Sequence, residues 1–248
     1  MVIYTLGLGE YMTEGMRLNK YMAQAGLCSR READRYIEKG QVYINGCKAV
    51  MGQIVYPNDK VIIGTKQLVN QDKKIILAWN KPVGVTCTER DKHAKTKIFD
   101  VFRYPVRLTY AGRLDKDSQG LLIMTNDGDL IHNMMRGSNG HEKEYVVKVD
   151  KELSDDFKRL MEHGVYLNEL RQTTKPCKVT VEGKYTFRII LTEGLNRQIR
   201  RMCEALGYEV KSLTRVRVVN IVLGDLKPGA YRELTEAERK ELYSICRK

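Results

Sequence analysis

The sequence predicts an α+β fold in two unequal parts, a small module of helices and a hairpin followed by a larger domain rich in strands. Three observations support this prediction. Helical spacing and a tight-turn pair dominate residues 16–66, and β-prone runs recur from residue 75 onward. Between them, residues 67–74 are polar, contain lysine and have no apolar period, so we expect a linker there.

The composition limits the classes of partner. The chain has 248 residues, enough to bury a substantial core, and its 43 Lys and Arg exceed its 31 Asp and Glu to give a net charge of +12. This excess favours a polyanionic partner, either nucleic acid or an anionic membrane surface. No apolar run approaches the roughly 18 to 20 residues that span a bilayer, so we expect no membrane insertion.

The cysteines and the N-terminus carry no functional signal. The six cysteines are scattered, without a Cys-x-x-Cys pair, and the chain has only four histidines. This spacing predicts neither a zinc site nor a disulfide framework, and we expect buried free thiols in a reducing cytoplasm. Residues 1–15 lack the basic start and cleavage pattern of a signal peptide, and we expect a disordered leader.

The first part, residues 16–66, begins with two predicted helices. Apolar residues at helical spacing predict the first helix, which ends at Gly26: Leu18, Tyr21, Met22 and Ala25. Ser29-Arg30-Arg31-Glu32 is a capping box that starts the second. Asn45-Gly46 lies between apolar runs and predicts a tight hairpin.

This first part is also basic. It contains nine Lys and Arg against four Asp and Glu, and the second helix carries Arg31, Arg35 and Lys39 at intervals of four, with Arg30 beside them. Such a stripe suits a phosphate-binding surface, but it is also what an ordinary solvated helix face looks like. The residues alone leave both interpretations open.

The larger part begins with a predicted buried strand at residues 75–79. Further β-prone runs follow at 145–149, 185–191 and 211–223. Between the last two, Arg197, Arg200 and Arg201 fall three and four residues apart, so on a helix they share one face. A second capping box at residues 235–238 predicts a final helix that reaches Cys246.

A short turn at residues 112–120 combines acidic side chains with flanking glycines. Asp115 and Asp117 lie in it, and four apolar residues after it predict a buried strand. Their spacing imitates a calcium loop, but Gln119 and Asn126 stand where that loop needs a second Asx and a bidentate Glu. A plain surface turn with solvated acids is the other alternative, and the residues alone do not decide.

Several motifs resemble one known family. Gly112-Arg113-Leu114-Asp115-Lys116-Asp117-Ser118-Gln119-Gly120-Leu121 resembles the signature of RNA pseudouridine synthases of the RsuA, RluB, RluE and RluF group. Residues 141–145 and 194–204 are similar to further motifs of that group, closest to its RluF-type members. Residues 80–84 resemble the motif that opens the catalytic domain. The segments 17–21, 28–34 and 40–46 resemble the S4 RNA-binding domain.

The resemblance implies a domain organisation and a set of site residues. It implies an S4-like ααβ domain over residues 16–66 and a mixed α+β catalytic domain on an antiparallel sheet over 75–248. Asp115 would be the catalytic carboxylate, Tyr145 the tyrosine that stacks on the target base, and Arg200 the arginine that pairs with Asp115. The RNA-binding residues would be Arg17, Lys20, Arg30, Arg31, Arg35, Arg113, Arg197 and Arg201, with Arg113 entering the space that the flipped base vacates.

The implied reaction detaches uracil from its ribose, rotates it and rejoins it through C5, without a metal or cofactor. Asp115 either attacks C1′ or removes a proton from C2′, and the sequence leaves both mechanisms open. The implied substrate is 23S rRNA or its precursor, with a tRNA anticodon uridine as a second candidate, for a monomeric cytoplasmic enzyme. Other specificities within the group remain alternatives. So does a non-catalytic RNA-binding or ribosome-assembly factor, although the joint presence of Asp115, Tyr145 and Arg200 argues against it.

Overall fold

The computed structural model describes residues 15–69, 73–89 and 91–247. These residues form two compact units that divide between Lys73 and Lys74. Residues 1–14 of the predicted leader and 70–72 of the predicted linker lie outside the described residues. Gln67 lies in a strand and Leu68 is buried in the N-terminal core, so these two residues of the predicted linker belong to the N-terminal unit instead.

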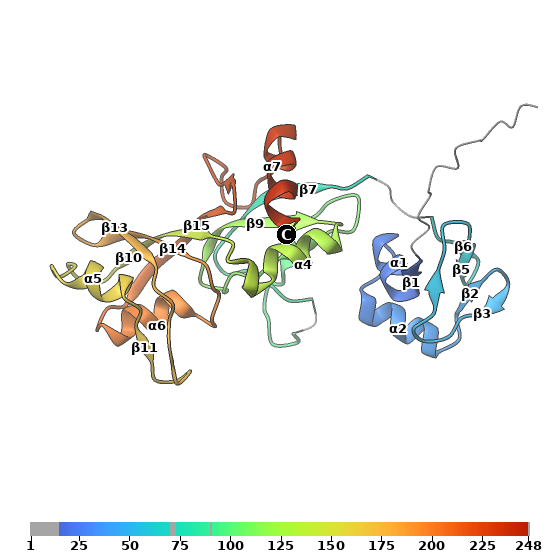
Figure 1. The fold of residues 1–248 in the computed structure, drawn as a ribbon, viewed down its shortest axis with the longest axis horizontal. Coiled ribbons are helices and arrows are strands. Elements are labelled where there is room, and N and C mark those ends of the chain that lie inside the picture. Colours follow the sequence, from blue (N-terminus) through green and yellow to red (C-terminus); the bar gives the residue numbers. More distant parts are fainter. Residues whose placement is uncertain (1–14, 70–72, 90, 248) are drawn as a thin grey trace, which may run out of the picture. The chain divides into compact units, whose positions relative to one another are not determined.

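The N-terminal unit packs two helices on a small antiparallel sheet. Its elements are β1 (Met16–Arg17), α1 (Leu18–Gln24), α2 (Arg30–Glu38), β2 (Val42–Ile44), β3 (Cys47–Lys48), β4 (Ile54–Val55), β5 (Val61–Ile63) and β6 (Lys66–Gln67). Strands β3, β2, β5 and β6 form one sheet in that order, and β1 pairs with β4 (Figure 1). The apolar faces of α1 and α2 close the core against β2 and β5.

The predicted local signals of this unit are confirmed. The Ser29 hydroxyl accepts a hydrogen bond from the Glu32 amide at 3.3 Å, and the Glu32 carboxylate accepts one from the Ser29 amide at 2.9 Å, which completes the capping box of α2. Asn45 and Gly46 both have positive φ, 51° and 84°, as the tight hairpin turn between β2 and β3 requires.

The C-terminal unit is built on one twisted sheet. Its elements are β7 (Ile76–Lys81), α3 (Ile98–Val101), β8 (Thr109–Ala111), β9 (Gln119–Thr125), α4 (Gly128–Met135), η1 (Gly137–Asn139), β10 (Lys143–Val149), α5 (Phe157–Glu162), β11 (Tyr166–Leu167), β12 (Gln172–Thr173), β13 (Lys178–Gly183), β14 (Thr186–Leu191), α6 (Gln198–Ala205), β15 (Val210–Val218), β16 (Ile221–Val222), β17 (Tyr231–Glu233) and α7 (Glu236–Cys246). The sheet has the order β13-β14-β10-β15-β9-β7-β17, with β16 added to β15 and β8 to β9.

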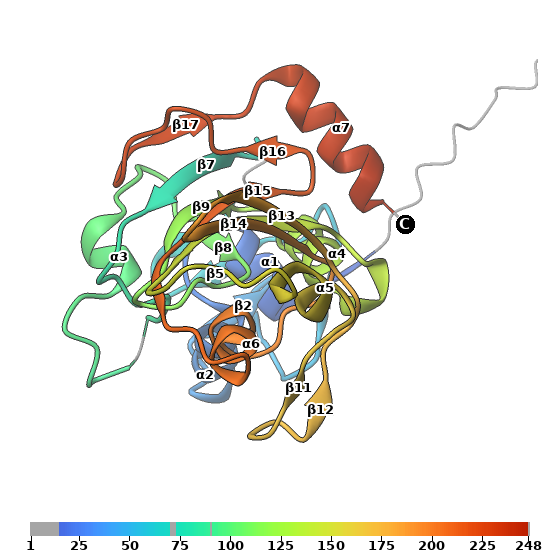
Figure 2. The same ribbon diagram turned by 90° about the vertical axis from the view of Figure 1, so that its left-hand side faces the viewer.

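The predicted antiparallel sheet is confirmed with one exception. All neighbouring strands run antiparallel except β15 and β9, which meet in a short parallel pairing of Thr214 with Gln119 and Arg215 with Gly120. Helices α5 and α6 pack on one side of the sheet, here called the inner face, and α4 and α7 pack on the other, the outer face (Figures 1 and 2). Strand β7 is buried along its whole length because it has layers on both sides.

The predicted strands occur with shifted ends. The run 75–79 extends to Lys81, the run 145–149 begins at residue 143, and Val219 (φ 57°) breaks the run 211–223 into β15 and β16. Tyr185, which was predicted to start a strand, lies in the turn before β14 and is exposed. The final helix begins at its predicted capping box and ends at Cys246.

Two compositional expectations can be compared with the fold. Cys28, Cys87, Cys203 and Cys246 are buried free thiols, as expected, but Cys47 is exposed because it follows the tight hairpin turn on a two-residue strand that faces solvent. Within the described ranges, no helix is both long and apolar enough to cross a membrane.

Candidate active site

The loop between β8 and β9 holds the carboxylates that the sequence singled out. Leu114 and Ser118 are buried on either side of Asp115, and the Ser118 amide donates to the Asp115 carbonyl oxygen at 3.1 Å. The Gly84 amide donates to the Lys116 carbonyl oxygen at 2.8 Å and ties the loop to the turn after β7. With its neighbours anchored inward, Asp115 directs its carboxylate into a cleft.

Gly120, the second residue of β9, lies at the parallel contact between β9 and β15. Its φ is 118°, and an added Cβ would overlap the Arg215 carbonyl oxygen and lie 2.5 Å from the Arg215 nitrogen. Only glycine permits this approach of two backbones. The approach fixes where the loop leaves the sheet.

The cleft lies entirely within the C-terminal unit and has a volume of about 580 Å³. That volume is within the range of sites that hold one small molecule. Its wall is formed by the loop after β8, the start of β10, the turn before α6 and the middle of β15: among others Arg113, Asp115, Lys143, Tyr145, Arg197, Arg200 and Arg215. Five residues that the sequence singled out therefore line this one cleft: Arg113, Asp115, Tyr145, Arg197 and Arg200.

Strand β10 gives two residues to the cleft by its period of two. Lys143 and Tyr145 both project from the inner face, beside Leu191 of β14. Tyr145 is half-buried and packs against the apolar cores on both sides of the cleft. An aromatic ring held in this way can offer a face on which a planar base stacks.

A β-bulge sends two nearby arginines of β15 to opposite faces. Glu144 lies opposite Arg217, whereas Tyr145 lies opposite Arg215, so Val216 is the extra residue. Arg215 enters the cleft wall, where its Nε donates to the Leu121 carbonyl oxygen at 2.7 Å and its Nη1 donates to the Arg113 carbonyl oxygen at 3.4 Å. It therefore clamps the backbone before and after Asp115.

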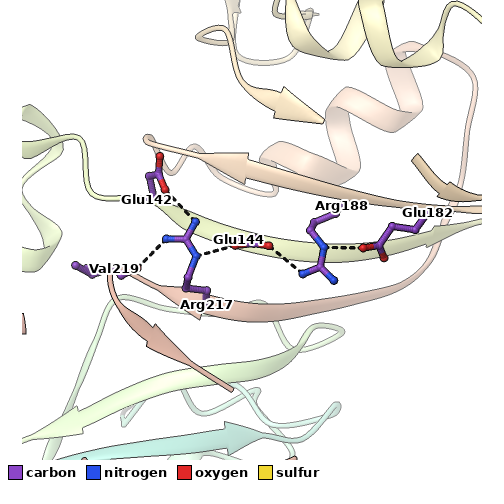
Figure 3. Close-up of polar contacts among 6 residues, drawn as sticks. All are labelled: Glu142, Glu144, Glu182, Arg188, Arg217 and Val219. Atoms are coloured by element: carbon purple, nitrogen blue, oxygen red, sulfur yellow. Dashed lines mark hydrogen bonds and ion pairs between the residues drawn. The ribbon is translucent and has the colours of Figure 1, made fainter. Parts of the chain in front are cut away.

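On the outer face, Arg217 joins a ladder of ion pairs across β10, β13, β14 and β15 (Figure 3). It contacts Glu144 at 2.7 Å and Glu142 at 2.9 Å, and Arg188 contacts Glu144 at 2.9 Å and Glu182 at 2.7 Å. Burial alone would raise the pKa of Glu144, but the hydrogen bonds from Arg217 and Arg188 outweigh it and keep the pKa below its ordinary value. The ladder holds the start of β10, and hence Tyr145, in place.

The predicted ion pair between Arg200 and Asp115 is not among the contacts of the described residues. The Arg200 Nη2 instead donates to the carbonyl oxygen of Asp117 at 2.9 Å. The side chain near the carboxylates is Arg197, whose Nη1 lies 4.0 Å from the Asp115 Oδ2 and 3.8 Å from the Asp117 Oδ2. Arg197 precedes α6 with φ 51°, so its side chain does not lie on the helical face that it was expected to share with Arg200 and Arg201.

Asp115 is only half-buried in the wall of the cleft. The solvent-accessible surface of its side chain is 35% of that of a fully exposed side chain.

Arg201 does not reach the cleft, because it donates to the Asn196 carbonyl oxygen at 3.0 Å and forms an ion pair with Glu169. Arg201 therefore lies with the β11–β12 hairpin rather than with the candidate catalytic group.

Three cations near the cleft were missed as site residues. Lys81 is fully buried and donates to the carbonyl oxygens of Pro82 and Val85 at 2.8 and 2.9 Å. Burial lowers the pKa of Lys81, although Cys87 and the loop carboxylates act to raise it. Lys143 and Arg215 are the other two. The position of Lys143 two residues before Tyr145 was a usable signal, whereas nothing in the sequence marks the bulge that turns Arg215 inward.

In the N-terminal unit, the predicted RNA-binding side chains lie on or beside the two helices. Arg17, Arg30, Arg31 and Arg35 are exposed and Lys20 is half-buried.

No group of three or more His, Cys, Asp or Glu in the described ranges could hold a metal ion. The arrangement of the cleft is that of a carboxylate beside an aromatic platform and several cations.

Comparisons with known proteins agree on one family. Residues 75–205 match the family model for RNA pseudouridylate synthase, and residues 16–61 match the S4 domain. The chain is 47% identical over 232 residues to the dual-specificity RNA pseudouridine synthase RluF of Escherichia coli O6:H1, covering 93% of this chain and 79% of the relative. It is 34% identical over 237 residues to an uncharacterized RNA pseudouridine synthase of Mycobacterium bovis, covering 92% and 93%. A crystal structure of a pseudouridylate synthase has a TM-score of 0.67 at 29% identity, covering 92% of this chain and 99% of that one.

Proposed function

The chain belongs to the RNA pseudouridine synthase family, and on that premise we propose that it converts a specific uridine of 23S ribosomal RNA to pseudouridine, with a tRNA uridine as a second substrate. The double substrate is supported by the 47% identity to enzymes named dual-specificity synthases. We also propose that it acts as a monomer in the cytoplasm, where ribosomal RNA is made and processed in bacteria.

We assign the acting carboxylate to Asp115. The observation that carries this assignment is the convergence of Asp115, Tyr145 and Arg197 on one cleft from three separate segments of the chain. In either form of the mechanism the carboxylate must be ionised, and Arg197 places a positive charge 4.0 Å from it.

The other cleft residues divide into base-holding and positioning roles. Tyr145 stacks on the uracil that has left its helix, which offsets part of the unstacking cost of a few kcal/mol. Arg113 is exposed at the rim of the cleft and fills the gap that the base leaves in the RNA. Arg200 positions the loop through the Asp117 carbonyl oxygen, and Arg197 takes the charge-compensating role first given to Arg200.

RNA affinity comes chiefly from the N-terminal unit in this proposal. Its exposed arginines would neutralise phosphates and release counterions, which makes binding depend strongly on salt. This assignment is supported by the S4 match over residues 16–61 and by the exposure of Arg17, Arg30, Arg31 and Arg35.

The test is release of tritium from C5-labelled uridine in unmodified 23S rRNA fragments and tRNA transcripts. We expect release by the wild type and a loss of at least about 1000-fold in Asp115→Asn, with RNA affinity within about threefold, because removal of an essential catalytic group costs rates of this order. The matched control is Asp225→Asn, which removes an exposed carboxylate of the same unit that does not line the cleft.

The outcomes separate the two classes of function. An active Asp115→Asn variant would remove the assignment of the carboxylate. Tight binding without release from any RNA would favour a non-catalytic assembly factor. Size-exclusion chromatography with light scattering tests the monomer.

A further inference from the structure

Cations on the two faces of the sheet formed by β10, β14 and β15 differ in their partners. On the outer face, Arg188 and Arg217 each contact two carboxylates (Figure 3). On the inner face, Lys143 and Arg215 have no carboxylate within ion-pair distance among the described residues. Strands β14 and β15 thus carry paired cations on the outer face, whereas β10 and β15 carry unpaired cations in the cleft.

The unpaired cations are satisfied only in part. The Lys143 ammonium donates to the carbonyl oxygen of His141 at 3.1 Å, which uses one of its three N–H groups. Arg215 is only 3% exposed, and its Nη2 is buried without a hydrogen-bond partner in the described part of the chain. Burial lowers the pKa of Lys143, and the nearby Arg215 lowers it further.

A half-buried lysine beside a buried arginine, with no carboxylate within ion-pair distance of either, is costly, because burial reduces their hydration and the two charges repel each other. An anion that binds in the cleft beside these two cations would offset this cost. Asp115 does not fill this role, since its contacts are with Arg197.

We propose that Lys143, backed by Arg215, holds the negative charge of the uracil base while that base is detached from its ribose. This inference rests on the proposed function and adds a catalytic group to it. Lys143 reaches the base because it projects from the same face of β10 as Tyr145, two residues away.

The step balances without a proton donor. When the glycosidic N1–C1′ bond breaks, its electron pair stays on the base and gives a uracil monoanion with charge on the ring nitrogens and on O2 and O4. C1′ then forms a bond to the Asp115 carboxylate, or becomes part of a glycal after Asp115 has removed the C2′ proton. C5 of the rotated anion then bonds to C1′ with a pair from the ring, and either Asp115 leaves as a carboxylate or its proton returns to C2′. In the last step the C5 proton passes to a base and N1 takes up a proton, which gives neutral pseudouridine. Fixed cations lower the barrier to the earlier bond cleavage by meeting charge where it develops.

An RNA phosphate is the other anion that could meet these cations. Position favours the base, because Arg215 is buried and Lys143 is half-buried beside Tyr145, whereas Arg113 and Arg197 at the cleft are exposed. A phosphate contact would mainly change affinity for RNA, and a contact with the developing anion would mainly change the rate of the chemical step.

The experiment compares Lys143→Met with Lys148→Met in single-turnover conversion of saturating RNA, with affinity measured separately. Lys148 lies on the same strand, faces outward and is exposed, so it is the matched control. We expect Lys143→Met to lose about 100-fold in rate with affinity within threefold, since removal of one such donor typically costs 10²- to 10³-fold. Lys143→Arg should recover at least about tenfold of that loss, which a variant that merely misfolds would not allow.

A second arm changes the leaving group. In RNA with 5-fluorouridine at the target site, the fluorine stabilises the base anion, so consumption of this nucleotide should depend less on Lys143. We expect the Lys143→Met loss to shrink by about tenfold relative to uridine RNA. An equal loss on both RNAs, a rate within threefold of wild type, or a loss confined to affinity as a phosphate contact predicts, overturns the proposal. If the wild type converts no RNA, the proposed function has failed instead.

Discussion

Replacement of Glu238 by glutamine should destabilise the C-terminal unit in a way that depends on pH. The Glu238 carboxylate accepts hydrogen bonds from the Arg232 Nη2 at 2.7 Å and Nη1 at 2.8 Å. It also accepts one at 2.8 Å from the amide of Thr235, which is the N-terminal cap of α7. The hydrogen bonds from Arg232, with burial opposing them and the Thr235 amide helping, lower the pKa of Glu238 from 4.5 to about 2.

The expected magnitude follows from that shift. At 1.36 kcal/mol per pKa unit, it corresponds to about 3 kcal/mol of folding free energy at neutral pH. The side chains of Arg232 and Glu238 keep 33% and 21% of their exposure, so solvent screening reduces this to about 2 kcal/mol. Because the folded-state pKa is depressed, the contribution is present in full above about pH 4.5 and is lost as pH falls toward 2, more than half of it by about pH 3.

The chain offers an intrinsic probe for this measurement. Trp79 is the only tryptophan, it is fully buried, and it lies opposite Tyr231 in the β7–β17 pairing next to Arg232. Urea unfolding followed by its fluorescence should show Glu238→Gln about 2 kcal/mol below wild type at pH 7, with the gap closing at acid pH. Glu236→Gln, an exposed first-turn residue, is the control. A gap that stays constant from pH 7 to pH 3, or one below about 0.5 kcal/mol at pH 7, would refute the reasoning.

Two further variants test the catalytic loop and the basic helix. Gly120→Ala should cost at least about 3 kcal/mol of stability and most of the activity, because Ala tolerates neither φ 118° nor the backbone of Arg215 so close by. Urea unfolding measures the loss of stability, and tritium release measures the loss of activity. A stable, active variant would contradict the close approach. The double variant Arg31→Ala/Arg35→Ala should bind RNA more weakly, and the slope of its log affinity against log salt should be smaller by up to about two. Titrations between 50 and 200 mM salt measure this slope. An unchanged slope would mean that these exposed arginines do not contact phosphates.

The sequence predicted the residues whose position depends on the local chain. The turn that holds Asp115 is followed by a strand of unbroken apolar residues, and Tyr145 lies in a β-prone run, so both could be located from pattern and motif. The capping boxes at Ser29 and Thr235 were predictable for the same reason, because each is decided by residues within one helical turn.

Features that depend on distant strands were not predictable. Strand β17 has three residues, and it forms because β7, about 150 positions earlier, offers it an open edge. The bulge at Val216 reverses the face of Arg215, so a strict period of two assigns that side chain wrongly. The spacing of Arg197 and Arg200 is helical, but Arg197 has a left-handed conformation and lies before the first residue of α6, so the two do not share a helical face.

The single parallel contact between β9 and β15 has a consequence for the order of folding. Strands β10, β13, β14 and β15 pair with one another within residues 143–218, whereas β7 and β9 need β17 to complete their side of the sheet. These two half-sheets are joined at Arg215 and Gly120, almost a hundred positions apart in sequence, and contacts of such long range form slowly. Asp115 lies beside this junction and Tyr145 on the other half. We therefore expect the cleft to assemble late, so that a chain still being synthesised would bind RNA through its N-terminal helices before it could modify it.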